Sequence, residues 1–173
     1  MNTISLIVGN GCSLLAMVTD SLSSTRKTAK SVLMVQNLSQ LAYCISSIVL
    51  KGYSGAVQNA VSILRNLIAI RNIKSKVLEW FMVALGVVLG VCFNNMGLVG
   101  YLPIVANLEY TLAIFRFKDN ERALKIAFLI SVVLFGTFNG FIFNFVGVAT
   151  NAVVLVAGII SLARTAKKQQ DNP

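Results

Sequence analysis

The sequence has no histidine, and charged residues make up only 12% of its 173 positions. Without histidine, the chain lacks the most common general base, metal ligand and neutral-pH switch. Three cysteines, Cys12, Cys44 and Cys92, lie far apart in apolar stretches, without the spacing of a zinc or redox site. These absences predict a protein that is not an enzyme and holds no metal or cofactor, and we expect the cysteines to be buried as small hydrophobic residues.

Carboxylates are also scarce: six Asp and Glu residues stand against 15 Lys and Arg, so the net charge is +9. The mean hydropathy is +0.77. The 12% share of charged residues is about half the share of about 25% in a typical soluble domain. A helix needs about 20 residues to cross a bilayer core, so seven crossings would use about 140 residues. We therefore expect an all-α integral membrane protein without a sizeable soluble domain.

Apolar runs bounded by charged or turn residues predict seven transmembrane helices, at about 4–22, 29–50, 54–71, 78–94, 97–115, 124–143 and 146–164. If these helices alternate in direction, thirteen of the 15 cations fall on one side of the membrane: Arg26, Lys27, Lys30, Arg71, Lys74, Lys76, Arg116, Lys118, Arg122, Lys125, Arg164, Lys167 and Lys168. Only Lys51 falls in a loop on the other side. The bias predicts an inner (plasma) membrane protein with its N-terminus outside and its C-terminus cytoplasmic. It also predicts contact with anionic lipids, rather than with nucleic acid.

An internal repeat organises the chain. The segment 55–61 (GAVQNAV) and the segment 147–153 (GVATNAV) share Gly, Asn, Ala and Val at one offset of 92 residues. Three helices at 1–72 and three at 97–173, joined by a linker helix at 73–96, would then form two parallel repeats. In the linker, Gly86 and Gly90 form a GxxxG pair that allows either close packing within the chain or a homo-oligomer. Gly136 and Gly140 form a second pair.

Polar residues recur at helical spacing within the apolar runs, which is costly in lipid and favours positions facing the protein interior or a cavity. The candidate binding residues at such positions are Gln40, Asn59, Ser62, Arg65, Asn107 and Asn151. Amides and hydroxyls both donate and accept hydrogen bonds, so they suit a neutral polar solute. The same side chains would alternatively tie helices together.

Arg65 is the one cation that the topology does not explain. Three alternatives are open for its guanidinium. It snorkels to the cytoplasmic surface, it pairs with Glu109 or Asp20, or it binds an anionic group. Asp20 and Glu109 are the carboxylates within apolar runs and are candidates for ion or proton coupling. Pro103 would interrupt the hydrogen-bond ladder of the fifth helix and act as a hinge.

Three segments carry a resemblance to a known family: Gly55 to Arg71, which ends in RNLIAIR, the LPIV stretch from Leu102, and the LAIFR stretch from Leu112. They resemble the bacterial inner membrane protein family named after YgjV, which implies a class of protein rather than a substrate. The three-one-three plan is also similar to SWEET sugar facilitators and PnuC-type vitamin transporters. In SWEETs an Asn on the third helix of each half faces the solute, which implies this role for Asn59 and Asn151. The chain lacks the prolines of SWEETs in its first half and the tryptophans of PnuC, so neither substrate carries over.

These patterns predict a small transporter or facilitator that moves a small polar solute through a midplane site between two three-helix bundles. The alternative is a non-transporting interaction or receptor-like membrane protein, in which the polar stripes hold helices or a partner. An intramembrane enzyme is not expected, because the chain has no histidine to serve as a base.

Overall fold

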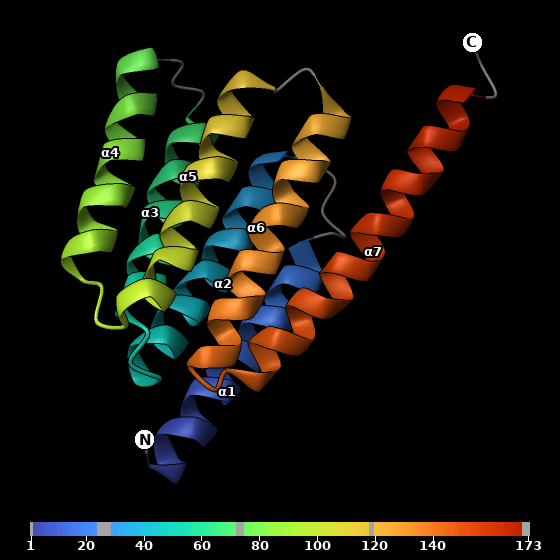
Figure 1. The fold of residues 1–173 in the computed structure, drawn as a ribbon. Coiled ribbons are helices and arrows are strands. Elements are labelled where there is room, and N and C mark those ends of the chain that lie inside the picture. Colours follow the sequence, from blue (N-terminus) through green and yellow to red (C-terminus); the bar gives the residue numbers. More distant parts are fainter. Residues whose placement is uncertain (1, 24–28, 72–74, 118–119, 171–173) are drawn as a thin grey trace.

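A computed structural model describes residues 2–23, 29–71, 75–117 and 120–170. Within these ranges the chain forms seven α-helices, one 3₁₀ turn and no β-strand (Figure 1). The elements are α1 (Thr3–Ser23), α2 (Ala29–Val49), α3 (Tyr53–Ile70), α4 (Lys76–Cys92), η1 (Gly97–Gly100), α5 (Tyr101–Arg116), α6 (Glu121–Phe141) and α7 (Phe145–Gln170). The all-helical class and the number of helices expected from the sequence are confirmed.

The short breaks between helices fall where turn residues predicted them. Lys51 and Phe143 adopt positive φ angles of 60° and 59°, and Gly97 adopts 57°, so the chain reverses within a few residues at each place. The fifth predicted helix begins as the 3₁₀ turn η1, and α7 continues six residues past the predicted end at 164. The segments 50–52, 93–96 and 142–144 lie at one end of the bundle, which we call the turn end (Figure 1).

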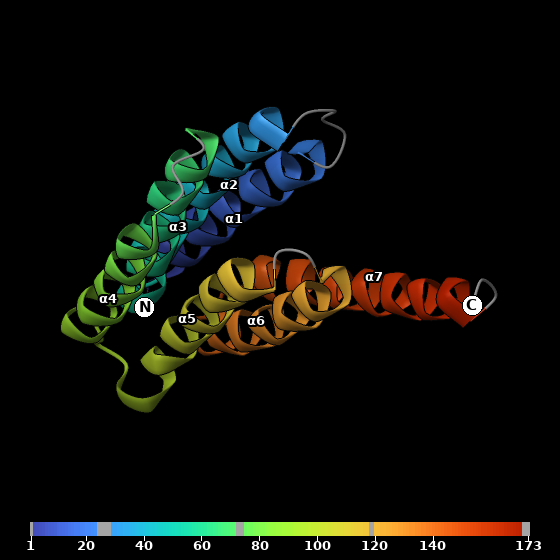
Figure 2. The same ribbon diagram turned by 90° about the horizontal axis from the view of Figure 1, so that it is seen from above.

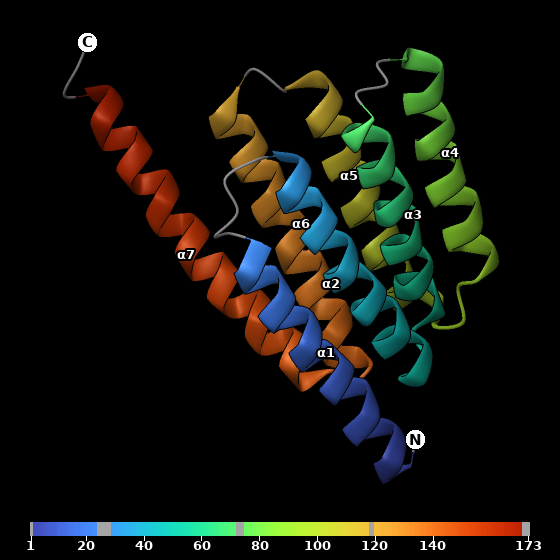
Figure 3. The ribbon, with the colours of Figure 1, turned by 180° about the vertical axis from the view of Figure 1, so that it is seen from behind.

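The helices form two rows. Along one row α2 packs between α1 and α3, and along the other α6 packs between α5 and α7 (Figure 2). The first helix of each row starts at the turn end, so the two rows run in the same direction (Figure 1). Helix α4 packs on α3 and α5 and links the rows at one edge, while α1 contacts α7 at the other (Figure 3). This arrangement agrees with the three-one-three order, and the repeat relation between the rows stays a prediction.

The distribution of side chains is inverted relative to a soluble protein. Ser13, Ser39, Ser46 and Ser54 have no exposed surface, while large hydrophobic residues such as Ile4 (71% exposed) and Val153 (69%) cover the outside. A soluble monomer rarely exposes so much apolar surface, but a bilayer requires it, because polar groups there must be satisfied within the protein. The described part of the chain therefore has the surface of a membrane-embedded bundle.

Two helical segments, Thr3–Leu22 and Arg122–Phe141, are long and apolar enough to cross a membrane by composition alone, and Leu33–Val49 and Phe145–Ile160 are shorter apolar segments. Helices α4 and α5 are shorter, with 17 and 16 residues. Helix α3 has 18 residues but carries buried polar side chains, among them Gln58. The number of crossings therefore stays a prediction. One expectation is corrected: Cys92 is exposed and Cys12 and Cys44 are only partly buried, because an apolar side chain on this surface faces lipid.

Apolar packing closes the turn end between the rows. Leu50, Phe138 and Ile142 form a buried cluster with exposures of 3%, 1% and 2%. A Cβ atom at Gly52 would lie 2.8 Å from the Phe138 ring, and one at Gly55 would overlap the same ring, so α3 approaches α6 only because both residues are glycine.

Two asparagines add hydrogen bonds across the turn end. The amide of Asn10 donates to Phe143 O (3.0 Å) and accepts from Val146 N (3.1 Å), which joins α1 to the start of α7. The amide of Asn95 donates to Lys51 O (2.6 Å) and accepts from Tyr53 N (3.3 Å), which joins the α4–α5 segment to the start of α3. Backbone groups left open at helix ends are thereby satisfied.

The GxxxG pair of α4 packs within the chain. Gly86 and Gly90 are both buried, and a Cβ atom at Gly90 would lie 2.5 Å from Gln58 Nε2 and 2.7 Å from Ile104 Cγ1. Small residues let helices approach closely, so this pair explains the contact of α4 with α3 and α5. The second pair lies against α7, where a Cβ atom at Gly136 would be 3.2 Å from Asn151 Cβ.

Apart from Arg65, the described cations lie at the two ends of the bundle. Lys51 lies at the turn end, whereas the following lie at or near helix ends on the opposite side: Lys30, Arg71, Lys76, Arg116, Arg122 and Lys125 (Figure 1). Arg26, Lys27, Lys74 and Lys118 lie outside the described residues, as do the side chains of Arg164, Lys167 and Lys168. Within the described part, the alternation of helix direction on which the predicted topology depends is confirmed.

Candidate binding cavity

A cavity of about 190 Å³ lies between the two rows. Side chains from α1, α2 and α3 line it on one side, and side chains from α5, α6 and α7 line it on the other. All six candidate binding residues contribute to its wall: Gln40, Asn59, Ser62, Arg65, Asn107 and Asn151. Asp20 also lines the cavity, whereas Glu109 and Pro103 are not among the residues that do. The sequence-predicted residues are thus brought together in one place.

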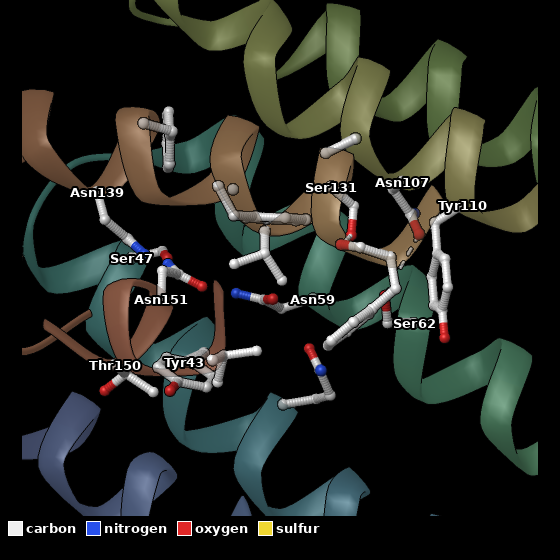
Figure 4. Close-up of a pocket in the computed structure, with 18 of the residues that line it drawn as sticks. Tyr43, Ser47, Asn59, Ser62, Asn107, Tyr110, Ser131, Asn139, Thr150 and Asn151 are labelled. Carbon is white, nitrogen blue, oxygen red and sulfur yellow. Dashed lines mark hydrogen bonds between the residues drawn. The ribbon is translucent and has the colours of Figure 1, made fainter. Parts of the chain in front are cut away.

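The cavity is polar along its middle and closed by apolar side chains at the turn end. Asn59 lies near the centre, with Asn139 and Asn151 to one side and Ser62 and Tyr110 to the other (Figure 4). Phe138 belongs both to the cavity wall and to the apolar cluster at the turn end. The cavity therefore ends at this apolar cluster.

The wall also contains residues outside the six candidate binding residues: Tyr43, Ser47, Tyr110, Phe128, Ser131, Phe135, Phe138, Asn139 and Thr150. Of these, the tyrosines, Ser47, Asn139 and Thr150 belong to the polar stripes that the sequence shows. On α6 the lining positions 128, 131, 132, 135, 138 and 139 follow the spacing of one helical face. That face is mostly apolar, so a search for polar stripes passes over it. Ser131 and Asn139 lie between or beside the phenylalanines of this face, and this pattern could have identified it.

Three amides in the wall have no hydrogen-bond partner in the described protein: those of Gln40, Asn59 and Asn151. The Asn59 residue is only 8% exposed, and its amide lies at the cavity without a partner among the described residues. Buried polar groups are nearly always hydrogen-bonded, and each exception requires an explanation. A polar occupant of the cavity, either water or solute, would supply the missing bonds.

A chain of hydrogen-bonded side chains runs from behind the wall to the cavity, where Asn107 and Arg65 line it. Gln58 Nε2 donates to Gly86 O (2.8 Å), and Asn107 Nδ2 donates to Gln58 Oε1 (2.7 Å). Asn107 Oδ1 in turn accepts from Arg65 Nη1 (3.0 Å). This chain of bonds connects the backbone of α4 through α3 and α5 to the edge of the cavity, so these amides tie helices together as the alternative interpretation predicted.

Arg65 turns inward. Its side chain is half-buried, and Nη1 also donates to Thr111 Oγ1 (3.1 Å) while the Tyr110 ring centre lies 5.5 Å from Cζ. Among the described residues no ion pair joins it to Asp20 or Glu109. Snorkelling and a buried pair, two of the three expectations for Arg65, therefore do not describe this structure, because neutral acceptors and an aromatic ring hold the guanidinium at the cavity.

Glu109 and Pro103, the other predicted functional residues of α5, lie away from the cavity wall. Glu109 is half-buried, and its Oε2 atom has no partner among the described residues. Pro103 lies in the first turn of α5, where the amide groups have no partner within the helix, so the expected interruption of the helix interior does not occur. Ion coupling by Glu109 and a hinge at Pro103 stay predictions.

Comparison with known proteins gives one match. A family model described as a bacterial inner membrane protein, Imp-YgjV, matches residues 7–169. No curated protein and no solved structure matches the chain. The matched range includes all the side chains named above for the cavity, and it agrees with the resemblance seen in the sequence.

Proposed function

We propose, since the chain belongs to the Imp-YgjV family of bacterial inner membrane proteins, that it is a small transporter or facilitator for a small polar solute. Its seven helices all cross the membrane in this proposal, with the N-terminus outside and the C-terminus in the cytoplasm. The two rows act as three-helix repeats, with the solute site between them and α4 as the linker.

The observation that carries the proposal is the cavity with its unpartnered amides. A membrane protein that used every polar side chain for packing would leave none unsatisfied, because lipid supplies no hydrogen bonds. Gln40, Asn59 and Asn151 instead keep free donors and acceptors in a cavity of about 190 Å³. At about 30 Å³ per water molecule, that volume corresponds to about six waters, which limits the solute to a small molecule.

Transport also needs a site that opens alternately to the two sides. In the proposed topology the turn end faces outside, and the cluster of Leu50, Phe138 and Ile142 closes the cavity in that direction. Uptake then requires the rows to part at the turn end, which breaks the Asn10 and Asn95 hydrogen bonds. A few such bonds, at roughly 0.6 kcal/mol each in membrane proteins, are compatible with reversible opening.

The direct test is solute uptake into proteoliposomes, with a compound that raises the melting temperature of the purified protein. We expect Asn59→Ala and Asn151→Ala each to lower the initial rate at least tenfold. Asn66→Ala is the matched control, because Asn66 lies on the same helix as Asn59 and is 7% exposed but does not line the cavity. Unchanged uptake in both cavity variants would remove these amides from the site.

The topology is tested separately, by fusing a reporter that is active only in the cytoplasm to the C-terminus. Exposed cations at the end opposite the turn end, including Lys76, Arg116 and Arg122, support a position of that end at the cytoplasmic leaflet with its anionic lipids. An inactive cytoplasmic reporter would reverse the orientation.

The alternative is a non-transporting interaction or receptor-like membrane protein. The bonded set Gln58, Asn107 and Arg65 favours it, since two of the six candidate residues, Asn107 and Arg65, belong to a chain of hydrogen bonds that holds helices together. Labelling of a cysteine placed at Asn59 by a membrane-impermeant reagent separates the two functions. Labelling from the cytoplasmic side supports a water-accessible pathway, whereas no labelling from either side supports the alternative.

A further inference from the structure

Arg65 differs in its chemistry from every other residue that lines the cavity. Among the described residues the wall contains one cation, Arg65, and one carboxylate, Asp20, and its remaining polar groups there are amides and hydroxyls. A charged arginine within a membrane protein is costly and usually marks a functional site with a partner of opposite charge. The nature of that partner is the question that the structure poses.

The protein orients the guanidinium of Arg65 without neutralising it. Its Nη1 atom donates to Asn107 Oδ1 and Thr111 Oγ1, and its plane lies over the Tyr110 ring. Asn107 is itself held by Gln58, which is bound to the backbone of α4. These are all neutral groups, and no ion pair to Arg65 occurs among the described residues. The positive charge is therefore fixed in place and left available.

The remaining donors of Arg65 match a planar anion. A guanidinium carries five N–H donors in a rigid fork, and the hydrogen bonds to the described protein all start from Nη1. The Nε and Nη2 donors are unused, and two such parallel donors bind a carboxylate in the two-pronged geometry that lysine cannot reproduce.

We propose that the cavity binds a small solute with a single carboxylate or equally planar oxyanion group, and that Arg65 holds this group. The inference rests on the proposed function, because it names the solute class of the same site. Gln40, Asn59 and Asn151 then bind the neutral polar part of the solute through their free amides. Asp20, the one carboxylate among the described residues of the wall, disfavours further negative charge on the solute, so a monoanion is expected rather than a dianion.

The test compares small carboxylates with their neutral amides, which have nearly the same size. Purified full-length protein is titrated with acetate, glycolate, lactate and 3-hydroxybutyrate, and with the four corresponding amides, while the melting temperature is measured. We expect at least one carboxylate to bind at least tenfold more tightly than its amide. Arg65→Gln should remove this preference, and Arg65→Lys should retain a smaller part of it because it keeps the charge but loses the fork.

Two results would overturn the inference: no carboxylate binds better than its amide, or Arg65→Gln binds the preferred carboxylate as tightly as the native protein. If Arg65→Gln is not monodisperse in size-exclusion chromatography, Arg65→Lys alone is compared with the native protein. Equal affinity of these two proteins for the preferred carboxylate then counts against the two-pronged contact. Binding of a neutral amide that Asn59→Ala abolishes would overturn the anionic class and leave the proposed transport standing. Absence of uptake for every compound that binds would overturn transport instead.

Discussion

Gln58 and Asn59 are neighbours in the sequence, carry the same functional group and are both buried, yet their amides have different surroundings and different roles. The Gln58 amide is bonded to Gly86 O and to Asn107 at 2.8 and 2.7 Å. The Asn59 amide has no partner among the described residues and points into the cavity (Figure 4). One residue step turns a helix by 100°, so Gln58 meets α4 and Asn59 meets the space between the rows. We call these two sides of α3 the packing face and the cavity face.

The comparison shows how a membrane protein divides polar residues between stability and binding. On the packing face, hydrogen bonds are complete and glycines bring the backbones close, so a change there should act on stability. On the cavity face, donors and acceptors are left open, so a change should act on binding and barely on stability. Three predictions test this division, in order of decreasing effect on the folded state.

The largest effect is expected from Gly90→Ala on α4, opposite the packing face. The new Cβ would lie 2.5 Å from Gln58 Nε2 and 2.7 Å from Ile104 Cγ1, so it must displace a bonded amide, at a cost of about 1–3 kcal/mol. Gly86→Ala is the matched control, since its Cβ would meet atoms at 3.4 Å or more and should change stability little. Melting temperatures in detergent compare the two, and equal values would contradict the close packing of α4.

A smaller loss is expected from Gln58→Leu, which keeps most of the volume and removes both hydrogen bonds. It leaves Asn107 Nδ2 without its partner and removes the additional bond that Gly86 O accepts beside its helix bond, which should destabilise the fold by about 1–2 kcal/mol. Because Asn107 positions Arg65, this variant should also weaken binding of the solute. Urea or thermal denaturation measures the first effect. A variant as stable as the native protein would mean that the packing face does not depend on its polar bonds.

The smallest effect on stability is expected from Asn59→Ala, on the cavity face. No protein hydrogen bond is lost, and removal of an unpartnered buried amide is neutral or slightly stabilising, within about 0.5 kcal/mol. Binding should nevertheless fall, so the melting temperature without ligand stays constant while the ligand-induced shift disappears. A large drop in the unliganded melting temperature would show that Asn59 belongs to the packing of the bundle.

Much of the fold and the membership of the candidate site could be predicted from local patterns. Hydrophobic run lengths and turn residues such as Gly52 and Gly97 placed the helices within a few residues, because these signals act over one or two turns. The 3.6-residue period identified the six lining residues, since a polar stripe in an apolar helix must face the protein interior. That rule could not identify the phenylalanines of α6, because an apolar side chain is compatible with a position in lipid as well as in the cavity wall.

What the sequence by itself determined is the set of helices, their alternating direction in the described part, and the polar face of each one. Only the tertiary structure decided what each polar group meets: α4 for Gln58, the cavity for Asn59, and neutral acceptors rather than Glu109 for Arg65. The physical reason is that helical period sets a direction around a single axis. The partner found in that direction depends on how seven helices pack. Glycines far apart in the sequence control this packing.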